Sequence, residues 1–151
     1  SSIFLELGIA DGISIGLDYV VDAIVTPTNT SNEDNSNENN VSAEFKDLTT
    51  IYAKIDVPLG GTYLKIGYSE VDVVSKEVMS SGNSYGDASS SGMTAGLGYN
   101  HEVSDGFSVR AELTLSEFDN VSTNNGQTNK TEIKVEDMIG ARATISIAKS
   151  F

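Results

Sequence analysis

The residues of this sequence that could do chemistry are charged side chains on the polar parity of segments that alternate in polarity. When every second residue is apolar, the residues between them share the other face of a strand. The charged residues on this polar face are Glu6, Asp18, Lys54, Asp56, Lys65, Arg110, Glu112 and Arg142. Acids and bases in equal number predict mutual ion pairs, because an unpaired buried charge costs several kcal/mol. We therefore expect a salt-bridged interior, with a polar channel as the alternative.

The sequence lacks the residue combinations from which catalytic and metal-binding sites are usually built. The chain has no cysteine, which excludes disulfides and thiolate metal sites, and its one histidine is His101. We expect His101 on an exposed rim beside a turn, where no Ser-His-Asp arrangement can be built around it. The acidic segment Glu33–Asn40 lacks the glycine and the ligand spacing of an EF-hand loop. We predict a non-enzymatic protein without cofactor or specific metal site.

The net charge of −13 argues against nucleic acid as a partner, because binding to phosphates needs a basic surface. Most acids outside the alternating segments fall in the long connections between them. We therefore expect acidic loops on one side of the molecule.

Alternation with a period of two predicts β-strands, each with one apolar face. The alternating segments are Ile3–Ile9, Ile13–Val21, Phe45–Val57, Thr62–Val73, Met93–Asn100, Phe107–Ser116 and Thr131–Phe151. The apolar parity runs for about nine residues in most of them, which is enough for a tilted strand to cross a membrane. The phase changes near Glu70, which predicts a β-bulge there or the exit of that strand from a membrane.

The connections alternate between short and long. Short turns are predicted near Asp11, Gly60 and Asp105. The long connections, predicted to be polar loops without periodicity, are Ala23–Glu44, Ser80–Ser91 and Asp119–Lys130. Short periplasmic turns and long extracellular loops are typical of transmembrane β-barrels. A soluble secreted β-sandwich, serving as an adhesion or phage structural module, also alternates and is the competing interpretation.

Aromatic residues on the apolar parity predict the girdles that flank the lipid-facing band of such barrels. They are Tyr19, Tyr68, Tyr99, Phe107 and Phe151. The chain ends IGARATISIAKSF, which resembles the C-terminal assembly signal of bacterial outer-membrane barrels at Ile145, Ile147 and Phe151. Lys149 departs from that signal, in which an aromatic residue is usual, but lysine can extend its ammonium group to the membrane edge. The resemblance implies recognition of the last strand by the barrel-assembly machinery.

Nearly the whole chain resembles small bacterial outer-membrane β-barrels of the OmpA/OmpX-like architecture, and more closely those of planktonic marine alphaproteobacteria. The segments that carry the likeness are ISIGLDYVVDAI, DLTTIYAKIDV, SYGDASSSGMTAGLGYNH, FSVRAEL with EFD, and ISIAKSF. The resemblance implies an all-β, antiparallel, up-and-down barrel in contact with outer-membrane lipid and lipopolysaccharide. It supplies no catalytic motif.

Seven strands can be counted in a single domain covering 1–151, whereas bacterial single-chain barrels have an even number. We therefore expect eight strands in the full protein, with the first lying upstream of Ser1. The expected function is a structural or surface role, with a phage or another surface ligand at the loops. The alternative is a narrow pore or transporter of small solutes.

Overall fold

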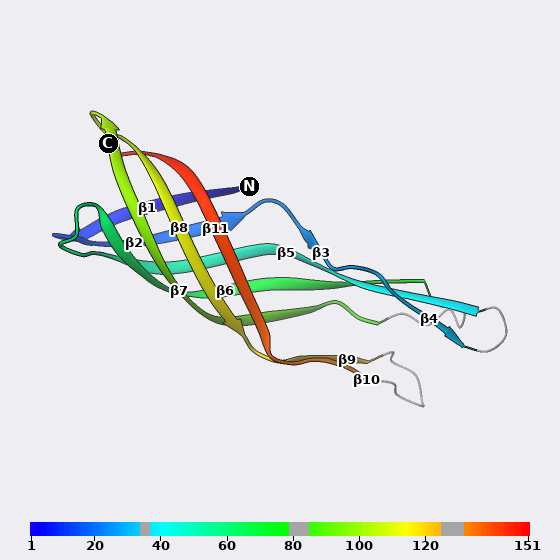
Figure 1. Ribbon diagram of the computed structural model, residues 1–151. Helices are drawn as coiled ribbons and strands as arrows, with labels where there is room; N and C mark the ends of the chain where they lie inside the picture. The colour runs from blue at the N-terminus through cyan, green and yellow to red at the C-terminus, as the bar shows by residue number, and fades with distance from the viewer. Residues whose placement is uncertain (34–36, 79–84, 125–131) are drawn as a thin grey trace.

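The computed structural model describes residues 1–33, 37–78, 85–124 and 132–151, and its main element is one antiparallel β-sheet (Figure 1). The order of strands along its main path is β1-β2-β5-β6-β7-β8-β11. Their bounds are β1 Ser2–Ala10, β2 Ile13–Val20, β5 Asn37–Asp56, β6 Thr62–Val78, β7 Ala88–Ser104, β8 Phe107–Phe118 and β11 Met138–Lys149. Within the described ranges, no helix is long and apolar enough to cross a membrane.

Tight turns join β1 to β2, β5 to β6 and β7 to β8, at the three places that the sequence predicts. Glycine occupies the left-handed positions of these turns, with φ of 69° at Gly12, 53° at Gly60, 91° at Gly61 and 75° at Gly106. A side chain would strain the backbone there. The turns lie at one end of the sheet, so the long connections lie at the other.

The sheet is curled, and its two ends approach each other across the interior. Arg110 of β8 reaches Glu6 of β1, and Arg142 of β11 reaches Asp18 of β2. Among the described ladders, β1 and β11 are the two ends of the strand order and do not pair with each other. The all-β antiparallel fold is therefore as predicted, whereas the predicted closure of the barrel is not present among the described strands.

The two faces of the curled sheet differ in polarity, and the apolar face is the outer one, which is the reverse of a soluble protein. Large apolar side chains point outward, and on β11 Ile139, Ile145 and Ile147 are 74%, 82% and 76% exposed. Polar and charged side chains make up most of the buried set, which includes Asp18, Thr50, Lys54, Lys65, Ser69, Thr94 and Thr114. Water is a poor solvent for such an outer surface.

This reversed arrangement ends partway along β6. Inward residues of β6 are polar or small as far as Ser69, which is fully buried, and then become apolar at Val71 and Val73, also buried. A bulge is present beside Glu70, as predicted, but not in β6, which pairs with β7 in unbroken register from Thr62 to Val73. The extra residue lies in the neighbouring β5, between Lys46 and Thr49. What changes along β6 is the polarity of its inner face and not the direction of its side chains.

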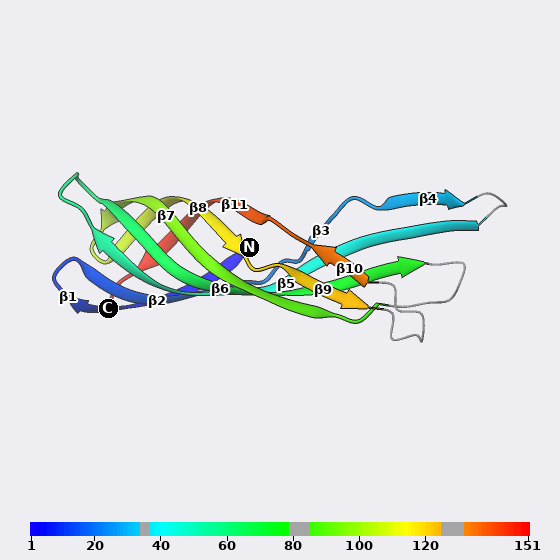
Figure 2. The ribbon, with the colours of Figure 1, turned by 90° about the horizontal axis from the view of Figure 1, so that it is seen from below.

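Beyond that point the strands continue as an extension (Figure 2). It contains the outer parts of β5, β6 and β7 and four short strands: β3 Ile24–Val25, β4 Asn29–Glu33, β9 Val121–Asn124 and β10 Glu132–Val135. The first two pair with β5, and the last two pair with each other.

Four of the predicted elements therefore differ in the structure. The segments 23–44 and 119–130 were expected to be loops but contain strands, and β7 begins inside the expected loop 80–91. The expected final strand is divided at Asp137, which has φ of 54°, into β10 and β11. Backbone ladders form here from Asn, Ser and Thr without apolar alternation, as in the antiparallel pairing of β4 with β5. The side-chain hydroxyl of Thr30 also donates to the side-chain oxygen of Asn40 across the two strands. Residues 34–36, 79–84 and 125–131 of these segments lie outside the described ranges.

Candidate functional site: the polar interior of the sheet

One part of the interior is a paired arginine and glutamate that join distant strands. Both terminal nitrogens of Arg110 on β8 donate to the carboxylate of Glu6 on β1, each at 2.7 Å. The Tyr52 hydroxyl on β5 donates to the same carboxylate at 2.9 Å. The guanidinium also lies 4.9 Å from the ring centroid of Phe4. Bidentate geometry makes this one of the stronger kinds of ion pair.

A second cluster is centred on Lys65 of β6, which is 4% exposed. Its ammonium nitrogen lies 2.9 Å from Glu112 of β8 and 3.5 Å from Asp18 of β2. Asp18 is also paired with Arg142 of β11. Tyr63 donates to the second oxygen of Glu112 at 2.9 Å. Side chains from opposite walls of the curled sheet thus meet in the middle.

The two remaining charged residues of the predicted set lie nearer the turns. Lys54 reaches Asp56 two residues along β5 at 2.8 Å, and the Asp56 side chain is 52% exposed. The structure therefore places all of the charged residues singled out in the sequence in ion pairs. Their role in closing the interior remains a prediction.

Sequence reasoning missed two tyrosines that complete these clusters. Tyr52 lies opposite Gly16 on β2, and Tyr63 lies opposite Gly98 on β7. A Cβ atom at either glycine would overlap the tyrosine ring, so these glycines provide the space that the rings fill. The signal in the sequence is an aromatic residue on the polar parity, with small residues on that parity in other strands.

A row of hydroxyl groups crosses the inner wall beside the charged clusters. Thr50, Ser69, Thr94 and Ser116 are linked in series by hydrogen bonds of 2.7, 2.6 and 2.7 Å. They come from β5, β6, β7 and β8 in order. The hydroxyls satisfy one another, so this level of the interior needs no water to solvate it.

The predicted girdle residues point away from this interior or lie at its rim. Tyr68, Tyr99 and Phe107 are 49%, 47% and 42% exposed, and Phe151 follows the end of β11. The hydroxyl of the half-buried Tyr19 donates to Asp47 at 2.5 Å. By register, Tyr19 and Tyr68 lie toward the extension, whereas Tyr99 and Phe107 lie toward the turns.

The C-terminal segment has a local explanation for its unusual lysine. The ammonium nitrogen of Lys149 lies 4.0 Å from the ring centroid of Phe107 and 5.8 Å from that of Phe151. A cation over an aromatic face is stabilised by the ring quadrupole.

His101 is exposed near the turns and stacks on Tyr99 with ring centroids 6.5 Å apart.

Comparison with known proteins agrees with this geometry. The family model for the outer membrane protein beta-barrel domain matches residues 2–136. The chain belongs to the outer membrane protein beta-barrel domain family. No curated protein and no solved structure matches it. An outer membrane protein beta-barrel domain is an integral part of the outer membrane, so the alternative of a soluble β-sandwich does not apply.

Membership in the outer membrane protein beta-barrel domain family explains the reversed faces of the sheet. Lipid is the solvent of the outward apolar side chains, and the polar interior is shielded from it. The inner face of β6 changes from polar to apolar between Ser69 and Val71, which is the change expected at the level where a strand leaves the lipid. Past that level apolar residues turn inward, as they do in any sheet surrounded by water.

Proposed function

We propose that this protein is a non-conducting, non-enzymatic outer-membrane barrel whose interior is plugged by ion pairs. The observation that carries the proposal is the pairing across the interior, in which Glu6 binds Arg110 and Asp18 binds both Lys65 and Arg142. A wall of about eight strands encloses a space that side chains fill, whereas sixteen or more strands leave an aqueous channel. The paired side chains and the tyrosines would occupy that space.

Function would then lie in the extension and in anchoring, not in transport. We assign the extension to the extracellular side, because long connections of such barrels face outward and short turns face the periplasm. Its acidic residues would meet lipopolysaccharide and a phage or another surface ligand. The barrel is thus a structural or surface element of a bacterial outer membrane, of the OmpA/OmpX-like kind.

The last strand is proposed to contact the barrel-assembly machinery. Ile145 and Ile147 are strongly exposed on the outer face of β11, and the side of β11 away from β8 is an unpaired edge among the described strands. Such an edge can pair with another strand. Phe151 would extend the same recognition surface.

Closure of the barrel is part of this proposal. Two unpaired edges in lipid would leave backbone N–H and C=O groups without partners, at a cost of several kcal/mol each. We therefore infer that an eighth strand pairs with both β1 and β11 in the membrane. We expect amide hydrogen exchange of the full-length protein in lipid to be slow at both ends of the sheet. The backbone amides on the side of β1 away from β2, and on the side of β11 away from β8, should be protected to the same extent as those of β6. Rapid exchange along both edges would show that the sheet stays open.

Planar-bilayer recording tests the plug. The purified full-length protein should insert and show no stable unitary conductance, because charged side chains occupy the interior. A sixteen-stranded porin inserted in the same bilayer is the positive control. Reproducible, ion-selective openings of the unmodified protein would contradict the plug and favour a narrow pore for small solutes.

A further inference from the structure

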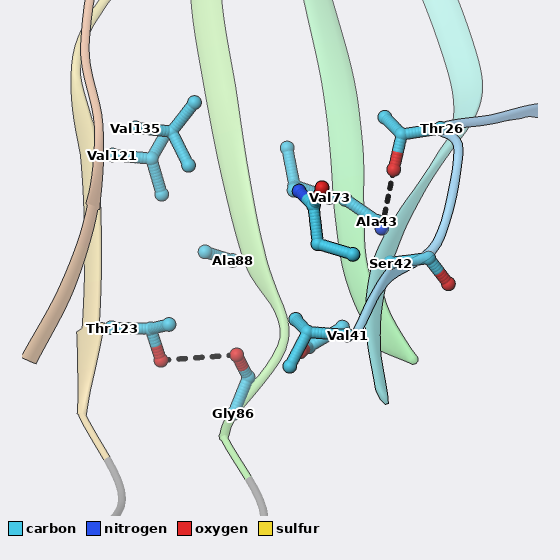
Figure 3. A pocket seen from close by; sticks show the side chains of 12 residues that line it. Thr26, Val41, Ser42, Ala43, Val73, Gly86, Ala88, Val121, Thr123 and Val135 are labelled. Carbon is cyan, nitrogen blue, oxygen red and sulfur yellow. Dashed lines mark hydrogen bonds between the residues drawn. The ribbon is translucent and has the colours of Figure 1, made fainter. Parts of the chain in front are cut away.

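The extension contains an apolar cavity of about 180 Å³ that is partly open to solvent. Its walls come from β5, β6 and β7 on one side and from the β9–β10 hairpin on the other (Figure 3). The apolar side chains that define it are Val41, Ala43, Val73, Ala88, Val121 and Val135. It lies past Ser69, in the part of the molecule where apolar residues face inward. The cavity is thus separate from the charged interior of the barrel.

Besides Asn29, the polar side chains that line the cavity are Thr26, Ser42, Ser75 and Thr123, and three of these four form hydrogen bonds with other groups of the protein. Thr123 donates to the carbonyl of Gly86 at 3.0 Å, and Thr26 accepts from the backbone N–H of Ala43 at 2.9 Å. Ser75 donates to Glu77 at 2.6 Å. The hydroxyl of Ser42 is turned away from the valines in Figure 3. The interior surface is therefore formed mainly by methyl groups, which would offer a polar ligand few partners.

The cavity is partly open to solvent, so water competes with any ligand for it. Water gains little in a cavity lined by methyl groups, whereas a cavity of about 150 Å³ lined by apolar side chains binds benzene or xenon. We propose that this cavity is a binding site for a small, neutral, apolar molecule of about the size of a substituted benzene. Ligand binding at this site would be a function in addition to the proposed structural or surface role. It does not depend on whether the barrel conducts.

Titration with toluene tests the site directly. The full-length protein carries ¹³C-labelled valine methyl groups and is placed in lipid nanodiscs. We expect saturable chemical-shift changes at Val73, Val121 and Val135. Val109 points outward in the lipid-facing band, where it is 41% exposed, and reports simple partitioning of toluene into lipid. Chemical-shift changes that do not saturate, or that are as large at Val109 as at the valines of the cavity, would overturn the proposal.

A matched pair of substitutions locates the ligand. Ala88→Phe places a ring in the cavity and should weaken toluene binding at least tenfold. Ser89→Phe adds the same ring at the next residue of β7, which is exposed on the other face, and should leave binding unchanged. Val121→Phe fills the cavity from the opposite wall if Ala88→Phe does not fold. Unchanged binding in a folded cavity-filling variant would place the ligand elsewhere and contradict the proposal.

Discussion

Replacing Arg110 by alanine is expected to lower the free energy of unfolding by about 3–5 kcal/mol. The substitution leaves the Glu6 carboxylate, whose side chain is 13% exposed, with Tyr52 as its only remaining partner among the hydrogen bonds described above. A buried charge that loses its counterion keeps its full desolvation cost. The measurement is equilibrium unfolding by urea in lipid vesicles, followed by tyrosine fluorescence.

Two controls separate lost pairing from lost packing. The double variant Glu6→Met with Arg110→Met removes both charges and should recover most of the lost stability, because well-packed apolar residues can replace a buried pair. Lys76→Ala breaks the exposed pair with Glu44, which is 3.0 Å long, and should cost less than about 1 kcal/mol. A loss under about 1 kcal/mol for Arg110→Ala, or a double variant no more stable than the single one, would show that the interior is wet and the plug absent.

The face on which each residue lies could be predicted from the sequence, because the period of a strand fixes it. Alternation places Leu113 outward and Thr114 inward, and the structure agrees, with exposures of 64% and 6%. The same rule places the charged residues together on the inner face. The level at which they meet could not be predicted. Arg110 and Glu6 are 104 residues apart, and their contact depends on the registers of the intervening ladders and on the curl of the sheet.

The extension was missed for a physical reason. Strand prediction by alternation depends on one face being apolar, but β4 and the first residues of β5 consist mainly of Asn, Ser, Thr and Glu. Their ladder is held by backbone hydrogen bonds, which are independent of side-chain polarity. The buried valines at 71 and 73 suggested a change of phase, because their apolar side chains lie on the face that is polar earlier in β6. A strand that passes from lipid into water is expected to show this change.

The second large effect is expected at an outward position in the apolar band. Leu113→Arg should destabilise the protein in a bilayer by about 2–4 kcal/mol, which is the cost of a cationic side chain facing the lipid midplane. Val78 provides a matched control, because it is also apolar, outward and 70% exposed, but it lies at the end of β6 in the extension. Val78→Arg should change stability by no more than about 0.5 kcal/mol, because an exposed side chain in water has little to lose.

The difference between these two variants, measured by urea unfolding of the full-length protein in lipid vesicles, tests most directly whether the exposed apolar face is a lipid face. Leu113 and Val78 are both apolar, outward and exposed to a similar extent, so the comparison reports mainly on the surrounding solvent. A membrane barrel with a water-exposed extension predicts that Leu113→Arg is less stable than Val78→Arg by about 2–3 kcal/mol. Equal stability of the two variants would contradict the account, because both positions would then lie in the same solvent.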